Sequence, residues 1–402
     1  MGEMTAHVSR WVLPVSSPPI AEGAVLMAGG RIQAVGPASD ILRGFKGAVC
    51  DHGAGAILPG LVNCHTHLEF SALAGRVLPQ ERWQDWLHLT LAASAALSPA
   101  EKEKGILQGI TDLRDCGTAL VGEISNTGES LAPLHASPLD YHLFYECLGF
   151  NLLDLGPLEE AFPFFATSRA VNNPYISAAA HAPYSVSPAL FRAVSQWNAA
   201  RHRPQSVHLS ESAAEMDFLA RGDGFFKNLL QARGRWLPDF SPPGMSPAAY
   251  LHSLGFLGPD TLAVHGAWLD ASDCRVLARS RAWVILCPRS NAYTAAGAPP
   301  VVELLQSGLP LALGTDSLAG NYDLNLFGEM LWLYQNYPQF PGDLWLYLGT
   351  LQGAQALHRE NELGSLEPGK KAVLGFVPLS RGQGFWQELY LNGAAGEWRW
   401  LG

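Results

Sequence analysis

The chain has 402 residues, of which 48% are hydrophobic and 15% charged, and its formal net charge is −10. A chain of this length can bury a sizeable core, either as two ordinary domains or as one large α/β barrel with an appendage. The acidic balance argues against a surface for nucleic acid or anionic membrane, which needs clustered Lys and Arg. We therefore expect a small-molecule substrate, with neither a nucleic-acid nor a membrane partner.

Cysteine usage and hydropathy indicate the cellular compartment. The six cysteines are scattered without a Cys-x-x-Cys pair, which is typical of a reduced cytosolic protein. The N-terminus lacks the apolar stretch of a signal peptide, and no window approaches the roughly 18 uninterrupted apolar residues of a membrane span. We predict a cytoplasmic protein, and the sequence is compatible with a homodimer.

The two ends of the chain have the pattern of short strands. Residues 1–58 contain "AVLMAGGRIQAVG", two apolar segments around Gly29-Gly30 that predict a hairpin. Residues 360–402 contain a Pro-Gly turn and a strand in "LGSLEPGKKAVLGFVPL", and "AAGEWRWLG" is a further candidate strand. We predict that the two ends together form a small composite β-sandwich.

Between them, residues 59–359 alternate short apolar strands with helical segments. The expected strands cover residues 56–67, 118–125, 140–149, 175–185, 205–212, 261–268, 282–291 and 309–317. Helices are expected over 99–116 and 187–202, and a long Pro- and Gly-rich loop over 233–250. Eight strands alternating with helices predict an α/β fold, a (β/α)8 TIM-type barrel with catalytic function.

Possible metal ligands stand at the ends of these strands. "LVNCHTHLEF" closes the first strand with His65 and His67, which share one face because strand residues i and i+2 do. With 13 histidines in the chain, one such pair alone is weak evidence. The fourth, fifth, sixth and eighth strands end in His181, His208, His265 and Asp316. Barrel enzymes assemble their sites at this rim, so we predict that these six side chains meet.

The chemistry of this set is that of a divalent metal ion. Three histidine nitrogens and one carboxylate suit Zn or Fe with an open position for water. Such an ion lowers the pKa of the water towards 7 and supplies a hydroxide nucleophile. Glu211 in "HLSES", three residues after His208, is placed to shuttle a proton.

The segments "PGLVNCHTHLE", "HLSES", "VHGAWLD", "CPRSN" and "LGTDS", in this order, resemble the amidohydrolase superfamily. Within it they resemble the branch of triazine hydrolases and guanine, cytosine and adenosine-type deaminases. The resemblance covers nearly the whole chain and implies an aminohydrolase acting on C–N bonds of cyclic amidines. It makes the metal ligands His65, His67, His208 and Asp316.

The same resemblance implies the catalytic roles. Asp316 would also take a proton from the metal-activated water, and His265 would orient or deprotonate that water. Glu211 would carry a proton to a ring nitrogen and then help ammonia to leave. Many relatives hold two metals bridged by a carbamylated lysine on strand four, but this chain has no Lys between Lys104 and Lys227. The resemblance therefore implies a single-metal site, which is typical of deaminases.

Two further segments point to a nucleoside substrate. "HAPYSVS" resembles purine-nucleoside deaminases, in which His181 would hydrogen-bond the purine ring. "NCHTHLEFS" resembles aminodeoxyfutalosine deaminases of an alternative menaquinone biosynthesis pathway, whose adenosine-like substrate carries a benzoate. We predict that activity. Deaminases of S-adenosylhomocysteine or methylthioadenosine share most of the motif and stand as the alternative.

A substrate carboxylate predicts an arginine near the site, because Arg binds carboxylates bidentately. Arg289 and Arg76 are the candidates, and Glu69 is a candidate acceptor for ribose hydroxyls. Trp83 and Trp86 either wall an apolar pocket or belong to a helix core, and we favour the core.

Two other classes of protein stay open. A guanine deaminase or a chlorohydrolase would use the same metal site, and only the purine segment and Glu211 favour nucleoside deamination. A non-catalytic metal-binding protein would have a closed site, often with Cys ligands. Because the predicted ligands line an open barrel mouth, this last class is the least favoured.

Overall fold

The structure is a computed structural model that describes residues 4–380 and 384–401. The chain divides into two compact units. One comprises Met1–Cys64, Ile110–Val121 and Leu324–Gly402, and the other His65–Gly109 and Gly122–Asp323. The first unit thus holds more than the two chain ends, and the domain boundaries predicted after residues 58 and 359 stay a prediction.

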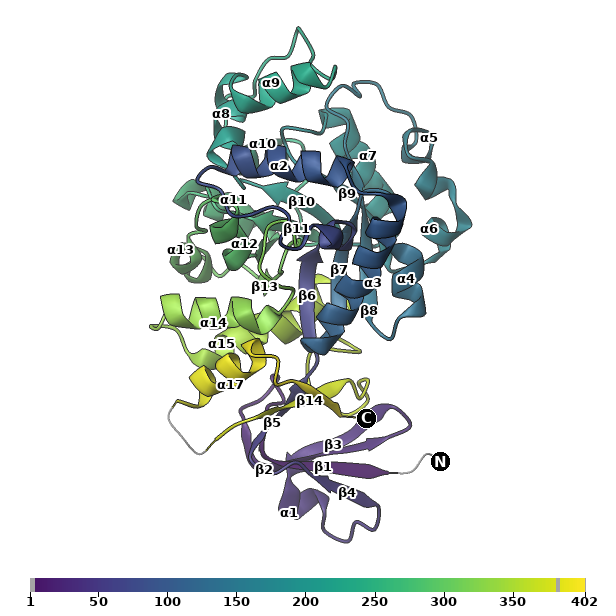
Figure 1. Cartoon of the computed structure of the whole chain (residues 1–402), viewed down its shortest axis with the longest axis vertical. Helices are drawn as coiled ribbons and strands as arrows, with labels where there is room; N and C mark the ends of the chain where they lie inside the picture. The colour runs from purple at the N-terminus through teal and green to yellow at the C-terminus, as the bar shows by residue number, and fades with distance from the viewer. Residues whose placement is uncertain (1–3, 381–383, 402) are drawn as a thin grey trace. The chain divides into compact units, whose positions relative to one another are not determined.

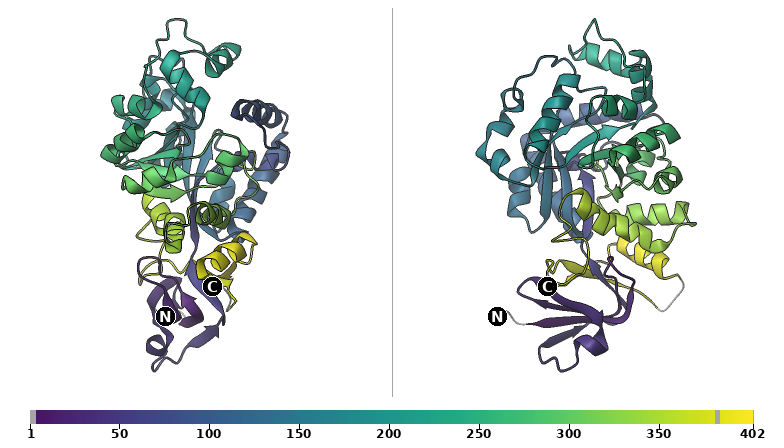
Figure 2. Two further views of the ribbon diagram at one scale, coloured as in Figure 1. Left: turned by 90° about the vertical axis from the view of Figure 1, so that its left-hand side faces the viewer. Right: turned by 180° about the vertical axis from the view of Figure 1, so that it is seen from behind.

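Both ends of the chain contribute strands to one seven-stranded sheet in the first unit. Its strands are β1 (Thr5–Val12), β2 (Ile20–Ala28), β3 (Arg31–Pro37), β4 (Ala48–Asp51), β5 (Gly55–Pro59), β14 (Leu374–Pro378) and β15 (Arg399–Leu401). The order is β15-β14-β5-β1-β2-β3, with β4 paired to β1, and Figure 2 shows β14 beside β5. The predicted hairpin is confirmed: β2 and β3 pair antiparallel, and Gly29 and Gly30 have the positive φ of its two-residue turn.

Helices complete this unit. They are α1 (Ala38–Ile41), α14 (Leu326–Asn336), α15 (Gly342–Tyr347), the π-helix η3 (Leu348–Gln352), α16 (Gly353–Ala356) and α17 (Phe385–Ala394). Helix α17 approaches α14 closely where Gly393 meets the ring of Phe327. A Cβ at Gly393 would lie 2.4 Å from that ring, so the contact requires glycine.

The predicted eight-stranded barrel is confirmed. Its strands are β6 (Leu61–Thr66), β7 (Thr118–Ser125), β8 (Asp140–Cys147), β9 (Ile176–Ala180), β10 (Gln205–Leu209), β11 (Thr261–His265), β12 (Trp283–Leu286) and β13 (Leu311–Leu313). They form two hydrogen-bonded groups, β6 to β9 and β10 to β13. The amide of His208 donates to the carbonyl of His181 at 2.8 Å, and that of Asp316 to His65 at 2.9 Å. These bonds join the two groups at both seams.

The first predicted strand is two strands in the structure. Residues 56–67 were expected to run continuously, but β5 ends at Pro59 and belongs to the terminal sheet, whereas β6 begins at Leu61 in the barrel. Proline has no N–H to donate to a strand partner, so the ladder is interrupted there. The chain changes sheets within two residues.

Helices cover the barrel strands on the outside (Figure 1). They are η1 (Leu68–Leu73), α2 (Trp83–Ala95), α3 (Pro99–Asp115), α4 (Leu131–Ala136), α5 (Leu158–Ala161), η2 (Pro163–Ala166), α6 (Ser168–Asn172), α7 (Pro188–Ala199), α8 (Ala213–Arg221), α9 (Phe225–Ala232), α10 (Pro247–Ser253), α11 (Ala271–Ser280), α12 (Pro288–Tyr293) and α13 (Val301–Gln306). The predicted helices over 99–116 and 187–202 are confirmed as α3 and α7. Ser187 caps α7 by accepting the amide of Leu190. The predicted loop over 233–250 is confirmed as far as Ser246, but its last four residues belong to α10, which begins at Pro247.

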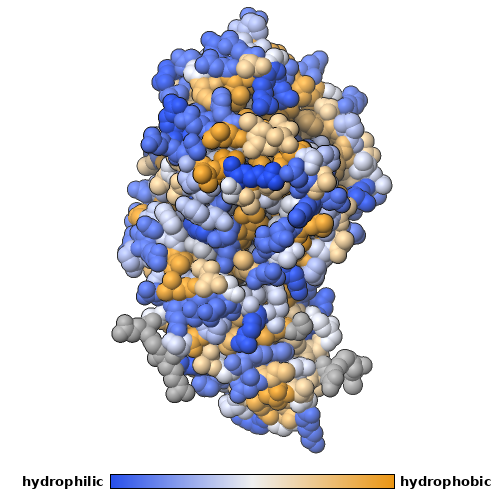
Figure 3. Space-filling model, in the orientation of Figure 1, coloured by the Kyte–Doolittle hydropathy of each residue, from blue (hydrophilic) through white to orange (hydrophobic). Residues whose placement is uncertain are grey.

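The surface is mixed in character. Hydrophilic and hydrophobic residues are interspersed over the face shown in Figure 3. Among the residues that the structure describes, no helix combines the length and the apolarity that crossing a bilayer requires.

Candidate active site

Ionisable side chains converge where the barrel strands end. His65 and His67 come from the end of β6, and their Nε2 atoms lie 3.2 Å apart. Asp316, three residues beyond β13, places Oδ1 3.7 Å from each of these nitrogens. Its other oxygen accepts a hydrogen bond from Ser290 at 2.6 Å. All of these side chains are buried, so the predicted convergence of the first and eighth strands is present in the structure.

At or just beyond the ends of three of these strands, one residue has an unusual backbone conformation. Ser210, His265 and Asp316 have φ values of 50°, 74° and 59°, in the left-handed region that residues other than glycine rarely occupy. Such strain costs on the order of 1–3 kcal/mol per residue and is typical of functional sites. His265 and Asp316 line the cavity at the barrel mouth, and Ser210 directly precedes Glu211, which also lines it.

The geometry of the donor set fits one divalent ion. Zn–N bonds of about 2.0–2.1 Å place tetrahedral ligand atoms roughly 3.3 Å apart. The separation of 3.2 Å between the nitrogens of His65 and His67 is close to that value. Their ligand atoms and one of His208 all lie within 4.8 Å of one another. Three histidines and a carboxylate are also the chemistry that Zn and Fe sites use.

The electrostatics keep two of these histidines neutral. Burial and the neighbouring histidines hold the pKa of His65 well below its usual value. Burial lowers the pKa of His67 to about 4, although Asp316 and Glu146 act in the opposite direction. A histidine must be unprotonated to bind a metal. Both side chains are therefore in the metal-binding state at neutral pH.

His208 is held by a carboxylate that the sequence analysis did not predict. Its Nε2 lies 3.2 Å from Oε1 of Glu146, a buried residue of β8. Burial alone would lower the pKa of His208, but the hydrogen bond and charge of Glu146 raise it to about 9, so a metal ion must displace a ring proton in order to bind this histidine. Metal-ligating histidines commonly donate their other N–H to a carboxylate, which fixes the ring. Glu146 stands in that relation to His208.

Replacing Glu146 with Ala is expected to weaken metal binding by about 10–100-fold, the usual effect of losing such a carboxylate partner. Competition with a chromogenic chelator measures the affinity directly. Asn126→Ala is the matched control, because Asn126 donates to the other oxygen of Glu146 at 2.6 Å and leaves the His208 contact intact. Equal affinities of wild type and E146A would contradict this assignment.

Glu211 is fixed at both its backbone and its side chain. It follows β10, two residues before α8 begins. The carboxylate of Glu215 accepts the amides of Ser210 and Glu211 at 3.0 and 2.9 Å. The indole N–H of Trp83 donates to Oε1 of Glu211 at 2.9 Å, in buried surroundings. An acid or base held in this way has little freedom to leave its reacting position.

His265 completes the group. Its Nε2 lies 3.1 Å from Nδ1 of His208 and 3.9 Å from Oε1 of Glu211. Its Nδ1 lies 2.9 Å from the side-chain oxygen of Asn291. An amide oxygen only accepts hydrogen bonds, so Nδ1 of His265 carries the proton. The lone pair of Nε2 is thereby left on the side of His208 and Glu211.

A cavity of about 240 Å³ opens onto these groups. It is lined by His67, Phe70, Trp83, Trp86, Leu87, Thr90, Leu91, Asn126, Glu146, Leu148, His181, Tyr184, His208, Glu211, His265, Asp316 and Ser317. His181 is thus at the cavity, and its Nδ1 lies 2.6 Å from the hydroxyl of Ser185. Trp83 and Trp86 line this cavity and also belong to a hydrophobic core cluster, which is the role favoured from sequence.

Three predicted substrate-binding residues do not line this cavity. Arg289 forms a bidentate pair with Asp323, with both distances 2.8 Å. Arg76 pairs with Glu101 at 2.9 Å on the exposed surface. In both cases a nearby carboxylate within the chain already binds the guanidinium. Their roles in substrate binding stay predictions that this geometry does not support.

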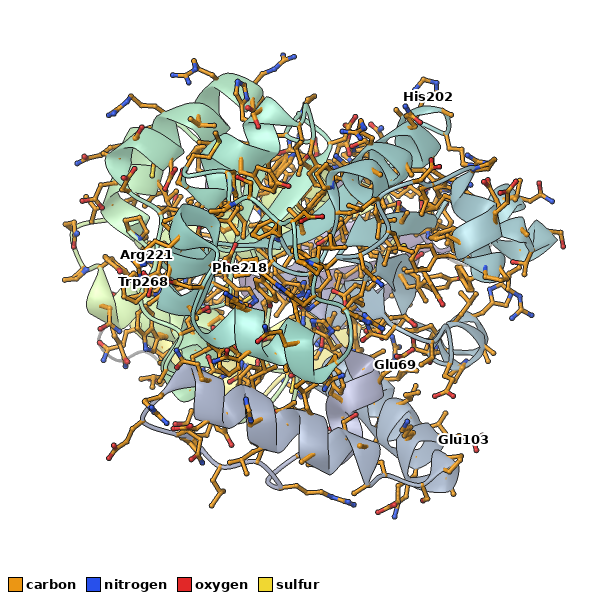
Figure 4. All side chains as sticks on the ribbon, turned by 90° about the horizontal axis from the view of Figure 1, so that it is seen from above. Glu69, Glu103, His202, Phe218, Arg221 and Trp268 are labelled. Atoms are coloured by element: carbon orange, nitrogen blue, oxygen red, sulfur yellow. The ribbon has the colours of Figure 1, made fainter. Side chains whose placement is uncertain are left out.

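Glu69, the third of these residues, makes its hydrogen bonds within the chain. It lies on η1 (Figure 4) and is buried. Its carboxylate accepts the amides of Asn126 and Thr127 at 3.0 and 3.2 Å, and the hydroxyls of Ser125 and Thr127. Glu69 therefore holds the loop after β7, and Asn126 on that loop lines the cavity. Ribose binding by Glu69 itself stays a prediction that this geometry does not support.

Sequence reasoning missed Glu146 and Asn126. Both stand at strand ends, Glu146 near the end of β8 and Asn126 directly after β7. The strand-end rule that selected the histidines would have found them, had it been applied to every polar residue.

Comparison with known proteins decides the family. The sequence model of the amidohydrolase family matches residues 56–388. The chain belongs to the amidohydrolase family. This amidohydrolase is accordingly a hydrolase that acts on C–N bonds.

Its curated relatives include nucleoside deaminases. It is 30% identical over 378 residues to 5-methylthioadenosine/S-adenosylhomocysteine deaminase of Syntrophobacter fumaroxidans, covering 89% of this chain and 80% of that protein. It is 28% identical over 375 residues to aminodeoxyfutalosine deaminase of Nitratiruptor, covering 90% and 89%. Among solved structures, a zinc-bound adenosine deaminase of Xanthomonas campestris matches with a TM-score of 0.79 and 25% identity, covering 96% and 88%.

Proposed function

We propose that this amidohydrolase removes the 6-amino group of an adenosine-type nucleoside as ammonia. The observation that carries the proposal is the position of Glu211 and His265, 3.9 Å apart, beside the buried histidines His65, His67 and His208 and the carboxylate of Asp316. A hydrolytic deaminase needs this pairing of a metal site with a proton shuttle. The deaminase names of its relatives support the same substrate class.

The proposed ligands of a single Zn or Fe ion are His65, His67, His208 and Asp316. When bound, the ion lowers the pKa of a water molecule towards 7 and so supplies the nucleophile. Both metals accept this donor set. The zinc in the similar adenosine deaminase favours zinc as the first metal to test.

The chain's own residues would move the protons. Asp316, oriented by Ser290, would take a proton from the attacking water. His265, with a lone pair on Nε2, would accept a hydrogen bond from that water and so orient it for attack. Glu211 would deliver a proton to the purine ring nitrogen and then to the leaving amino group. His181, which also lines the cavity, would hydrogen-bond the purine.

For the substrate itself we propose aminodeoxyfutalosine, which would place the enzyme in menaquinone biosynthesis. The support is the "HTHLEFS" segment and the similarity to the Nitratiruptor deaminase. A specific observation favours methylthioadenosine as the second candidate: among the described residues, the cavity lining includes neither Lys nor Arg. A benzoate finds no cationic partner in that lining, whereas a neutral methylthio group needs none.

Ammonia release from parallel assays tests both proposals. The metal-loaded enzyme is given aminodeoxyfutalosine, S-adenosylhomocysteine, methylthioadenosine, adenosine and guanine. The highest kcat/KM is expected for aminodeoxyfutalosine. A higher value for the sulfur nucleosides would move the assignment to the second candidate. Ammonia from guanine alone, or from none of them, would remove the adenosine-type proposal.

A further inference from the structure

Trp83 makes a polar contact that its place in the apolar wall does not require. Its indole N–H donates to Oε1 of Glu211 at 2.9 Å, and both side chains are buried. An indole has one donor and no acceptor, so this bond uses its full hydrogen-bonding capacity. By contrast, Trp86, one turn later on α2, donates at 2.7 Å to the backbone carbonyl of Ala319.

Packing fixes the direction of the Trp83 N–H. Trp83 is the first residue of α2, and its ring meets that of Phe226 edge-on with centroids 5.8 Å apart. Phe226 in turn stacks on Tyr184 at 3.6 Å, with an angle of 14° between the rings. Phe218, which points inward from α8 (Figure 4), belongs to the same hydrophobic cluster. Phe226 of α9 thus packs against the indole ring, and Tyr184 and Phe218 contact Phe226 in turn.

The bond distinguishes the two oxygens of Glu211. Oε1 accepts the indole hydrogen bond, and an accepting carboxylate oxygen beside a donor does not favourably carry a proton of its own. Oε2 is therefore left to carry it. The backbone of Glu211 is held independently by Glu215. Trp83 is then the residue that sets the orientation of the carboxylate.

We propose that Trp83 is a positioning residue for the proton shuttle: it holds Oε1 of Glu211 so that Oε2 delivers the proton to the purine ring nitrogen. This inference rests on the proposed deaminase function. Trp83 acts on the reaction through Glu211, in addition to lining the cavity. Its substitution must therefore affect kcat only while residue 211 can carry a proton.

The first test is Trp83→Phe, which removes the N–H and keeps an aromatic ring. We expect kcat for ammonia release to fall by about 10–100-fold, the value of a hydrogen bond to a charged group. KM and metal content should change little, because the metal ligands and the apolar wall remain. A wild-type kcat in W83F would overturn the inference.

A double-mutant cycle distinguishes an effect of Trp83 on the orientation of Glu211 from an effect of Trp83 on the shape of the cavity. Glu211→Gln and the double variant W83F/E211Q are measured beside the single variant. If Trp83 acts through Glu211, W83F should change kcat less than about twofold in the E211Q background, because contacting residues that act as a unit are non-additive. Equal fold-changes in both backgrounds would mean that Trp83 only shapes the cavity, and would overturn the inference.

Trp86→Phe is the matched control. It removes an indole N–H from the same helix and cavity, but its partner is the carbonyl of Ala319. Whatever its effect on kcat/KM, that effect should be the same in the wild-type and E211Q backgrounds. Absence of turnover of any nucleoside by wild type would instead remove the proposed function and this inference with it. An active wild type with an unaffected W83F removes the inference alone.

Discussion

Glu211→Gln is expected to lower kcat for ammonia release by roughly 10²–10⁴-fold, the usual contribution of a general acid–base residue. The amide keeps the size of the side chain and can still accept the indole hydrogen bond, but it cannot carry a proton. Bound metal should be retained, because Glu211 is not among the proposed ligands. Steady-state ammonia release and metal analysis of the same preparation measure both quantities.

The control for this variant is Glu103→Gln, the same chemical change at an exposed position of α3. It should leave kcat and metal content at wild-type values. If E211Q turned over substrate at the wild-type rate, Glu211 would not be the proton shuttle. If E211Q lost its metal, the role of the residue would be that of a ligand.

Removal of the metal is expected to abolish turnover and to lower the melting temperature. An ion that binds only the folded chain adds about 4 kcal/mol of stability when present at 1,000 times its dissociation constant. Dialysis against a chelator, followed by addition of Zn or Fe, should remove and then restore both properties. Ammonia assays and thermal unfolding on the same samples record the two effects, and the better of the two metals identifies the functional ion.

The ligand assignment is tested with His67→Asn. This variant should lose bound metal and the metal-dependent increase in melting temperature. His252→Asn is the matched change at an exposed histidine of α10, and it should behave as wild type. Full metal content in H67N would contradict the assignment of His67. A chelated wild type that kept its full rate would contradict a metal-dependent reaction.

Most of the barrel and its rim could be predicted because both depend on local pattern. Alternation of strands and helices predicts the closed sheet, and side chains at strand ends must then meet. The direction of His65 and His67 follows from the two-residue repeat of a strand, and the Gly29-Gly30 turn from the φ values it needs. Each of these features is determined by residues that are close together in the sequence.

What could not be predicted depends on contacts distant in sequence. Arg289 was a reasonable carboxylate ligand until Asp323 was seen to bind it. The walls of the cavity could not be told from helix core, because Trp83 is apolar in either place. Its partner Glu211 lies 128 residues further along the chain. Only the folded chain shows that the indole and the carboxylate meet.

The left-handed residues at the rim carry a consequence for laboratory evolution. Ser210, His265 and Asp316 each keep a conformation that glycine would adopt without strain. Selection for thermostability alone would therefore favour glycine at these positions, and at 265 and 316 this would remove a proposed catalytic side chain. Mutant libraries intended to raise the melting temperature of this enzyme should therefore leave these three codons unchanged and vary other positions.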